Sequence, residues 1–243
     1  MTRRLAAGVV ALVVTLSAAP ARGTRPLDTD DTETNDPGMT SLELGVDYVR
    51  TGGNQSGLFT ALVAVGLARG LELDVQGGLT LLEPDGHAAV GGPSDSFLFF
   101  RYRALDETAA RPALGVDLTL RLPTGQASRG LGLPGIDVQL LLVGQKRVGP
   151  VVLLANVGYT FTASGPDLWN LDAAIRYPLT ETWTLVGEIV GTVGTGPGGD
   201  TALLRGGVAW ALTAKITLDA ALAGGLAHDG PDVVLRTGVT IAF

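Results

Sequence analysis

The chain has 243 residues, 35 of them glycine and none of them cysteine, and its formal net charge at pH 7 is −7. The lack of cysteine excludes disulfides, thiolate metal sites and cysteine catalysis. An acidic chain is also a poor partner for nucleic acid, whose phosphates repel it, so no nucleic-acid partner is expected.

The chain begins with a predicted signal peptide, residues 1–21. Arg3 and Arg4 give it a positive start, residues 5–16 form an apolar run, and residues 19–21 read Ala-Pro-Ala, the small-residue pattern of a cleavage site. Beyond it, no apolar run reaches the roughly 18–20 residues of a membrane-spanning helix. Apolar residues come instead in pieces of about 9–12, the length of a tilted membrane strand.

Residues 22–38 follow as a polar, acidic segment that we expect to be a periplasmic leader. It has almost no apolar residues, so solvation and an extended or mobile backbone are the expected state. The segment lacks the glycine and the closing glutamate of a calcium-binding loop. Its acids are Asp28, Asp30, Asp31, Glu33 and Asp36.

From residue 39 to residue 243, segments with period-2 alternation repeat with turn signals between them. About twelve such segments are present, an even number, as in single-chain bacterial barrels. We therefore predict an all-β fold, a transmembrane antiparallel up-and-down β-barrel. The predicted strands are Ser41–Arg50, Leu58–Ala68, Leu71–Leu82, Ser96–Ala104, Pro112–Pro123, Asp137–Gln145, Val151–Phe161, Leu168–Leu179, Trp183–Val193, Ala202–Leu212, Lys215–Leu226 and Asp232–Phe243.

The predicted connections alternate between longer and tighter ones. With the amino terminus in the periplasm, each longer connection falls outside the cell and each tight one in the periplasm, which is the asymmetry of outer-membrane barrels. The longer connections are Thr51–Gly57, Pro84–Asp95, Thr124–Gly135, Ala163–Asp167, Gly194–Gly199 and His228–Pro231.

The last strand fixes which face of each strand points outward. Val239, Ile241 and Phe243 share an apolar face, so that face meets lipid, and Arg236 on the opposite face points into the lumen. Most aromatic residues then fall outward in two girdles, one at each membrane interface. The girdle positions are Tyr102, Tyr177, Trp183, Trp210 and Phe243 at the periplasmic end and Tyr48, Phe59, Tyr159, Phe161 and Trp169 at the outer end.

One observation leaves another interpretation open. Phe97 and Phe99 share the inward parity of Arg101 and do not fit the girdles. A soluble β-sandwich or a lipocalin-like barrel would bury its aromatic residues in a core, and it stays the alternative fold.

The inward positions carry many charges. Arg121 is predicted opposite Asp137, Glu188 opposite Arg205, and Asp172 opposite Glu188, and opposed charges on facing positions stabilise each other. Two interpretations stay open: a closed, salt-bridged interior, or a polar path whose charges select a solute. The predicted lumen residues are Glu43, Asp47, Glu72, Asp74, Arg101, Arg103, Asp117, Arg121, Asp137, Asp172, Arg176, Glu188, Arg205, Asp219 and Arg236.

No catalytic centre, cofactor or metal site is predicted. The two histidines, His87 and His228, both fall in predicted outer loops, away from any serine and acid at a matching strand height. A surface-loop role is the simpler interpretation for both residues, so an enzyme is not expected.

The stretch that begins RPLDTDDTETNDPGMTSLELGVDY resembles the opening of the family "Putative MetA-pathway of phenol degradation". That family often starts with an RP-x-x-TDD-type sequence and a short link into a first strand rich in alternating glutamate. The resemblance implies an outer-membrane, transporter-like barrel, sometimes linked to the uptake of aromatic compounds, and no agreed catalytic residues. The matching residues are Arg25, Pro26, Thr29, Asp30, Asp31, Glu43 and Tyr48.

Together these patterns predict a barrel in the Gram-negative outer membrane that passes small solutes passively, aromatic or hydrophobic ones among them. The alternative is a structural or interaction barrel with a closed lumen. The expected partners are outer-membrane lipid, the barrel-assembly machinery through the C-terminal strand, and a small-molecule solute.

Overall fold

The computed structural model describes residues 25–227 and 230–243, and the predicted signal peptide lies outside them. The described backbone forms thirteen β-strands and one short 3-10 turn, η1 (Ala127–Arg129). The strands are β1 (Thr40–Thr51), β2 (Asn54–Ala68), β3 (Leu71–Glu83), β4 (Val90–Pro93), β5 (Ser96–Leu105), β6 (Ala113–Leu122), β7 (Asp137–Val148), β8 (Val151–Phe161), β9 (Leu168–Pro178), β10 (Trp183–Gly194), β11 (Thr201–Ala211), β12 (Ile216–Gly225) and β13 (Val233–Ala242).

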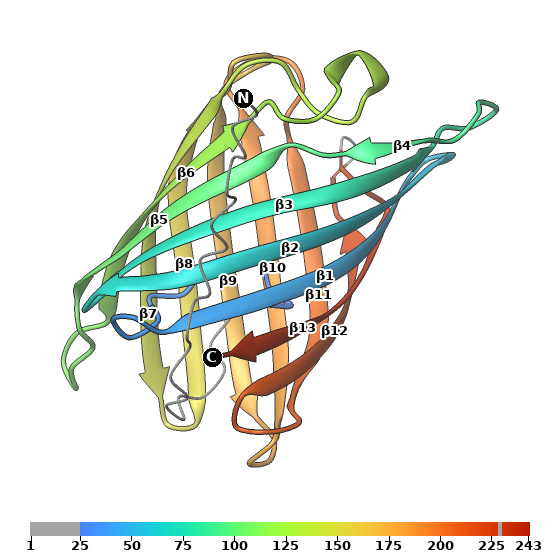
Figure 1. Cartoon of the computed structure of the whole chain (residues 1–243). Helices are drawn as coiled ribbons and strands as arrows, with labels where there is room; N and C mark the ends of the chain where they lie inside the picture. Colours follow the sequence, from blue (N-terminus) through green and yellow to red (C-terminus); the bar gives the residue numbers. More distant parts are fainter. Residues whose placement is uncertain (1–24, 228–229) are drawn as a thin grey trace, which may run out of the picture.

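Twelve of the strands close into a barrel, and the short strand β4 is additional to them. Every pairing is antiparallel, and β13 returns to pair with β1, so that Asp47 lies opposite Arg236 (Figure 1). Closure leaves no free strand edge in the ring. A free edge would expose backbone N–H and C=O groups that the membrane interior cannot hydrogen-bond. The predicted β-barrel is therefore confirmed.

The extra strand β4 lies within a predicted outer loop and corrects that prediction. Residues 79–82 of β3 pair with β4, whereas residues 71–76 of β3 pair with β5. β4 and β5 thus lie end to end along the same side of β3. Ser94 and Asp95, between them, belong to neither strand. This break sends the Asp95 side chain toward its partners in the 123–136 loop.

The two ends of the barrel differ, as predicted, but not at every connection. The loop end carries the long connections after β3 and β6, and the turn end carries short ones such as Gly149-Pro150. The predicted loop Thr51–Gly57 is wrong, because only Gly52 and Gly53 separate β1 from β2. Gly52 has a φ of 59°, a conformation that glycine adopts without strain, so this hairpin turns tightly.

Alternation sorts the side chains between the inside and the outside of the wall. In β6, Ala113, Asp117 and Arg121 are buried, while Val116 is exposed on the outer face. The predicted girdle residues follow this rule, and their contact with the membrane interfaces stays a prediction. Tyr48, Phe59, Tyr102, Phe161, Trp169, Tyr177 and Trp183 are exposed, while Tyr159, Trp210 and Phe243 are half-buried.

Aromatic side chains pair with each other on this outer surface. Trp183 and Trp210 lie opposite each other in register, with parallel rings whose centroids are 5.3 Å apart. Tyr159 meets Trp169 edge to face, with ring centroids 5.0 Å apart.

No helix in residues 25–227 or 230–243 is long and apolar enough to cross a membrane.

Candidate functional site in the barrel lumen

The segment before β1 enters the lumen, and we call residues 25–39 the leader arc. We predicted this segment to be solvated, and that prediction is wrong: Leu27, Thr29 and Asp31 are among its buried residues. Leu27 packs against Val152 of β8 and its apolar neighbours. Acidic residues can leave water when arginines and backbone amides replace it, and the wall supplies both.

The first anchor of the leader arc is Glu188 of β10. Its carboxylate accepts hydrogen bonds from the backbone N–H of Asp28 at 3.0 Å and from that of Thr29 at 2.8 Å. It also accepts one from the Thr29 hydroxyl at 2.7 Å. Arg205 of β11 pairs with Glu188 and reaches Asp28 at 2.7 Å. Glu188 and Arg205 lie opposite each other, as predicted, but they hold the leader rather than only each other.

The second anchor is Asp31. Its carboxylate lies 2.7 Å from the guanidinium of Arg176 on β9 and 3.4 Å from that of Arg101 on β5. Arg101 also contacts Glu72 at 3.2 Å and Asp117 at 3.3 Å. The arginine therefore joins three strands and the leader arc through one buried cluster.

The third anchor is Arg25, which occupies a slot in the wall. Its guanidinium lies 3.2 Å from Asp219 of β12 and donates to the carbonyl oxygen of Thr237 at 2.8 Å. Gly45 and Gly238, paired across β1 and β13, make room for this side chain, because a Cβ on either residue would collide with the Arg25 guanidinium. Small residues here let a long cation lie flat against the backbone.

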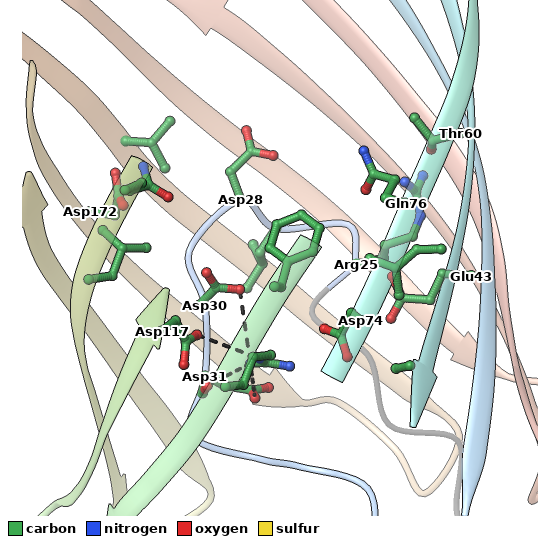
Figure 2. Close-up of a pocket in the computed structure, with 18 of the residues that line it drawn as sticks. Arg25, Asp28, Asp30, Asp31, Glu43, Thr60, Asp74, Gln76, Asp117 and Asp172 are labelled. Atoms are coloured by element: carbon green, nitrogen blue, oxygen red, sulfur yellow. Dashed lines mark hydrogen bonds and ion pairs between the residues drawn. The ribbon is translucent and has the colours of Figure 1, made fainter. Parts of the chain in front are cut away.

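Beyond the leader arc, a cavity of about 500 Å³ extends toward the loop end. Its lining includes ten carboxylate residues and three arginines, together with apolar side chains. Figure 2 shows Asp30, Asp31 and Asp117 on one side of this space and Arg25, Glu43 and Asp74 on the other. The apolar lining residues include Leu58, Leu62, Phe99, Leu141, Val190 and Leu203.

Of the fifteen predicted lumen residues, one group lines this cavity and another anchors the leader arc or a loop. Their part in selecting a solute stays a prediction. Arg103 differs, because it pairs with Asp106 at the turn end. The cavity-lining group is Glu43, Asp47, Glu72, Asp74, Arg101, Asp117, Asp172 and Arg236. The anchoring group is Arg121, Asp137, Arg176, Glu188, Arg205 and Asp219.

One predicted pair has a different register. Asp172 lies opposite Val190, not opposite Glu188, because Thr184 of β10 pairs with Pro178 of β9 and this sets the rest of the ladder. Asp172 therefore stands one inward position nearer the loop end, where it accepts a long hydrogen bond of 3.4 Å from the Gly191 amide.

A cluster around Asp95 at the loop end ties the 123–136 loop to the barrel wall, and we call it the loop clamp. The sequence did not predict it, because Asp95 falls within a predicted loop. Asp95 accepts hydrogen bonds from the backbone N–H groups of Gly125 at 3.0 Å and Leu133 at 2.9 Å, and pairs with Arg121 at 2.6 Å. Arg121 also holds Asp137 at 2.7 Å, as predicted. Burial alone would raise the pKa of Asp95, but these donors together hold it below its usual value.

The histidine predictions are tested for His87 alone. Its ring nitrogen Nδ1 lies 2.8 Å from the backbone oxygen of Asp85 in an exposed loop, whereas His228 lies outside the described residues. Across the part of the chain that the structure describes, no three His, Cys, Asp or Glu side chains gather to hold a metal ion.

Comparisons with known proteins agree with this architecture. The model of the family "Putative MetA-pathway of phenol degradation" matches residues 23–243. The COG4313 outer membrane channel from Pseudomonas putida F1 is similar in structure, with a TM-score of 0.68, 20% identity, and coverage of 89% of this chain and 100% of that one. The KdgM porin has a TM-score of 0.61, 10% identity, and coverage of 84% and 99%. No curated protein matches this sequence.

Proposed function

This chain belongs to the family "Putative MetA-pathway of phenol degradation" and has the fold of an outer-membrane, channel-like β-barrel, and from that premise we propose that it passes small solutes passively through its lumen. The observation that carries the proposal is the cavity of about 500 Å³ inside the closed wall. This volume falls in the range of roughly 300–1,000 Å³ in which proteins bind small molecules.

The size of the barrel supports a narrow path. Roughly eight strands leave an interior filled by side chains, and 16–18 leave an open aqueous channel. A barrel of twelve strands lies between these limits, and the leader arc fills part of its lumen. Passage is therefore limited to small molecules, and a solute crosses where the leader arc and the wall leave room or where the arc shifts.

The lining supports solutes with an apolar part. Leu58, Leu62 and Phe99 face the same cavity as the charged residues, so an aromatic or hydrophobic body finds apolar contact along the path. The description of the family, which refers to phenol degradation, agrees with aromatic solutes. We infer transport and not catalysis, because the two neighbouring structures are described as a channel and a porin.

A second candidate is a structural barrel with a closed lumen. The observation that favours it is the network of ion pairs by which Glu188, Arg205 and Arg101 hold the leader arc. In this candidate the leader arc is a permanent plug, and the cavity holds only water.

Conductance in planar bilayers and solute uptake into liposomes separate the two candidates. A channel gives discrete conductance steps in the wild-type protein, and Arg205→Ala shifts its reversal potential, because lumen charges tune ion passage. Folded wild-type protein, Glu188→Ala and Arg205→Ala that all lack both conductance and phenol uptake would establish the closed barrel. An open Arg205→Ala variant with an unchanged reversal potential would remove Arg205 from the selectivity residues.

A further inference from the structure

The charges of the cavity are unevenly paired. Its three arginines are all engaged: Arg101 with Asp31, Glu72 and Asp117, Arg25 with Asp219, and Arg236 with Asp28 and Asp47. On strands β3 and β1, Asp74 and Glu43 form no ion pair within 4 Å with these arginines. Arg25 lies on this side of the cavity too, but its guanidinium is already paired with Asp219.

Asp74 has a buried carboxylate oxygen without a hydrogen-bond partner in the described chain. It is 4% exposed, it lines the cavity, and its oxygen Oδ1 has no hydrogen-bond partner among the described residues. Burying a carboxylate without a partner is costly, so native structures rarely leave one unmatched without a role. Figure 2 shows Asp74 and Glu43 together on the same side of the cavity.

An aromatic residue stands beside this carboxylate. Asp74 of β3 lies directly opposite Phe99 of β5, and Phe99 lines the same cavity. Phe97 lies two residues along, opposite Gln76, with its ring centroid 6.0 Å from that of Phe99. These are the two inward aromatics that do not belong to the girdles. An aromatic face attracts cations through its ring electrons.

The adjoining strand completes the surface with small and apolar side chains. Ala64 of β2 lies opposite Asp74, and Leu62 lies opposite Gln76 on one side and Glu43 on the other. Facing positions on neighbouring strands stand about 5 Å apart. The inward residues Glu43, Leu62, Gln76, Asp74 and Phe99 therefore follow one another across β1, β2, β3 and β5, with Gln76 between Leu62 and Asp74.

We propose that this patch, defined by Glu43, Asp74, Phe99 and Leu62, is a subsite for an organic ammonium ion with an apolar body. The ammonium group donates to the carboxylates of Asp74 and Glu43 and lies against the Phe99 ring, while the apolar body contacts Leu62. A small metal ion fits less well, because the described residues gather no set of three ligands and the aromatic side offers no oxygen. An anion is disfavoured, because acidic residues outnumber arginines in the lining by ten to three.

The inference rests on the proposed function, since the subsite lies on the proposed solute path, but its test does not need transport. Isothermal titration calorimetry of the full barrel in detergent compares benzylammonium with benzyl alcohol and benzoate, which share the ring but not the positive charge. We expect benzylammonium to bind at least about tenfold more tightly than either.

Two variants locate the binding. Asp74→Asn keeps the size of the side chain and removes its charge, and should weaken benzylammonium binding about tenfold or more. Phe99→Leu should weaken it about threefold to thirtyfold. Asp85→Asn makes the same chemical change as Asp74→Asn in an exposed loop and should change nothing.

Equal affinity for benzylammonium and benzyl alcohol, or unchanged benzylammonium binding in folded Asp74→Asn, would overturn the subsite. Conductance and phenol uptake are read separately. A barrel that transports phenol but fails the binding test loses the subsite and keeps the channel. A barrel that binds benzylammonium through Asp74 but transports nothing keeps the subsite and loses the channel.

Discussion

Replacement of Glu188 by alanine should release the leader arc from the wall. The carboxylate is 3% exposed, accepts three hydrogen bonds from the backbone of Asp28 and Thr29, and pairs with Arg205. The substitution leaves two buried amides and a buried guanidinium short of their partner. Breaking a buried ion pair from one side costs about 3–5 kcal/mol.

Hydrogen exchange followed by mass spectrometry measures this release directly. Since every 1.4 kcal/mol is a factor of ten, the amides of residues 28 and 29 should exchange about 10²- to 4 × 10³-fold faster in Glu188→Ala. The barrel strands should keep their protection, because their ladders do not depend on Glu188. Asp172→Asn is the matched control, since Asp172 is a cavity-lining acid of the neighbouring strand that accepts a hydrogen bond from the Gly191 amide and forms no ion pair with the described arginines.

The same experiment can refute the account of the anchor. If residues 28 and 29 stay protected in a folded Glu188→Ala barrel, other contacts hold the leader arc and Glu188 is not its main anchor. If Asp172→Asn loosens them as much, a general effect of lumen charge is responsible.

Two further predictions concern the loop clamp and the wall. Because the folded pKa of Asp95 is depressed, its stabilisation of the 123–136 loop is complete above the unfolded value near 3.8 and is lost as the pH falls through the folded value. The protection of that loop's amides, taken relative to their intrinsic exchange rates, should fall at acid pH, and Asp95→Asn should remove this pH dependence. Gly238→Ala should destabilise the barrel by about 1–3 kcal/mol in urea unfolding, because its Cβ meets Arg25, whereas a Cβ at Gly224 meets nothing within 4 Å and Gly224→Ala should cost less.

The wall of the barrel could be predicted from the sequence because each strand carries its own signal. Alternation in a strand such as β6 needs no knowledge of its neighbours, and the parity of the last strand orders the others. Registers that depend on a tight turn were less secure: Arg121 and Asp137 face each other as predicted, whereas Asp172 is displaced by one inward position.

The leader arc could not be predicted, because nothing local in its sequence distinguishes burial from solvation. Its partners lie far along the chain: Asp28 meets Glu188, 160 residues away, and Arg25 meets Asp219, 194 residues away. An acid-rich stretch with few apolar residues stays solvated unless cationic side chains elsewhere in the fold pair with it. The inward parity of the lumen arginines was the one signal that could have suggested such a destination.

The distance along the chain between the leader arc and its anchors sets an order of assembly. Glu188, Arg205 and Asp219 belong to β10, β11 and β12, among the last strands to emerge during synthesis, and Arg236 of β13 completes the set. Contacts between such distant segments form late, because the intervening chain must first be ordered. The leader arc leaves the ribosome before these strands, so it can make its full set of contacts only once β10 to β13 are in place.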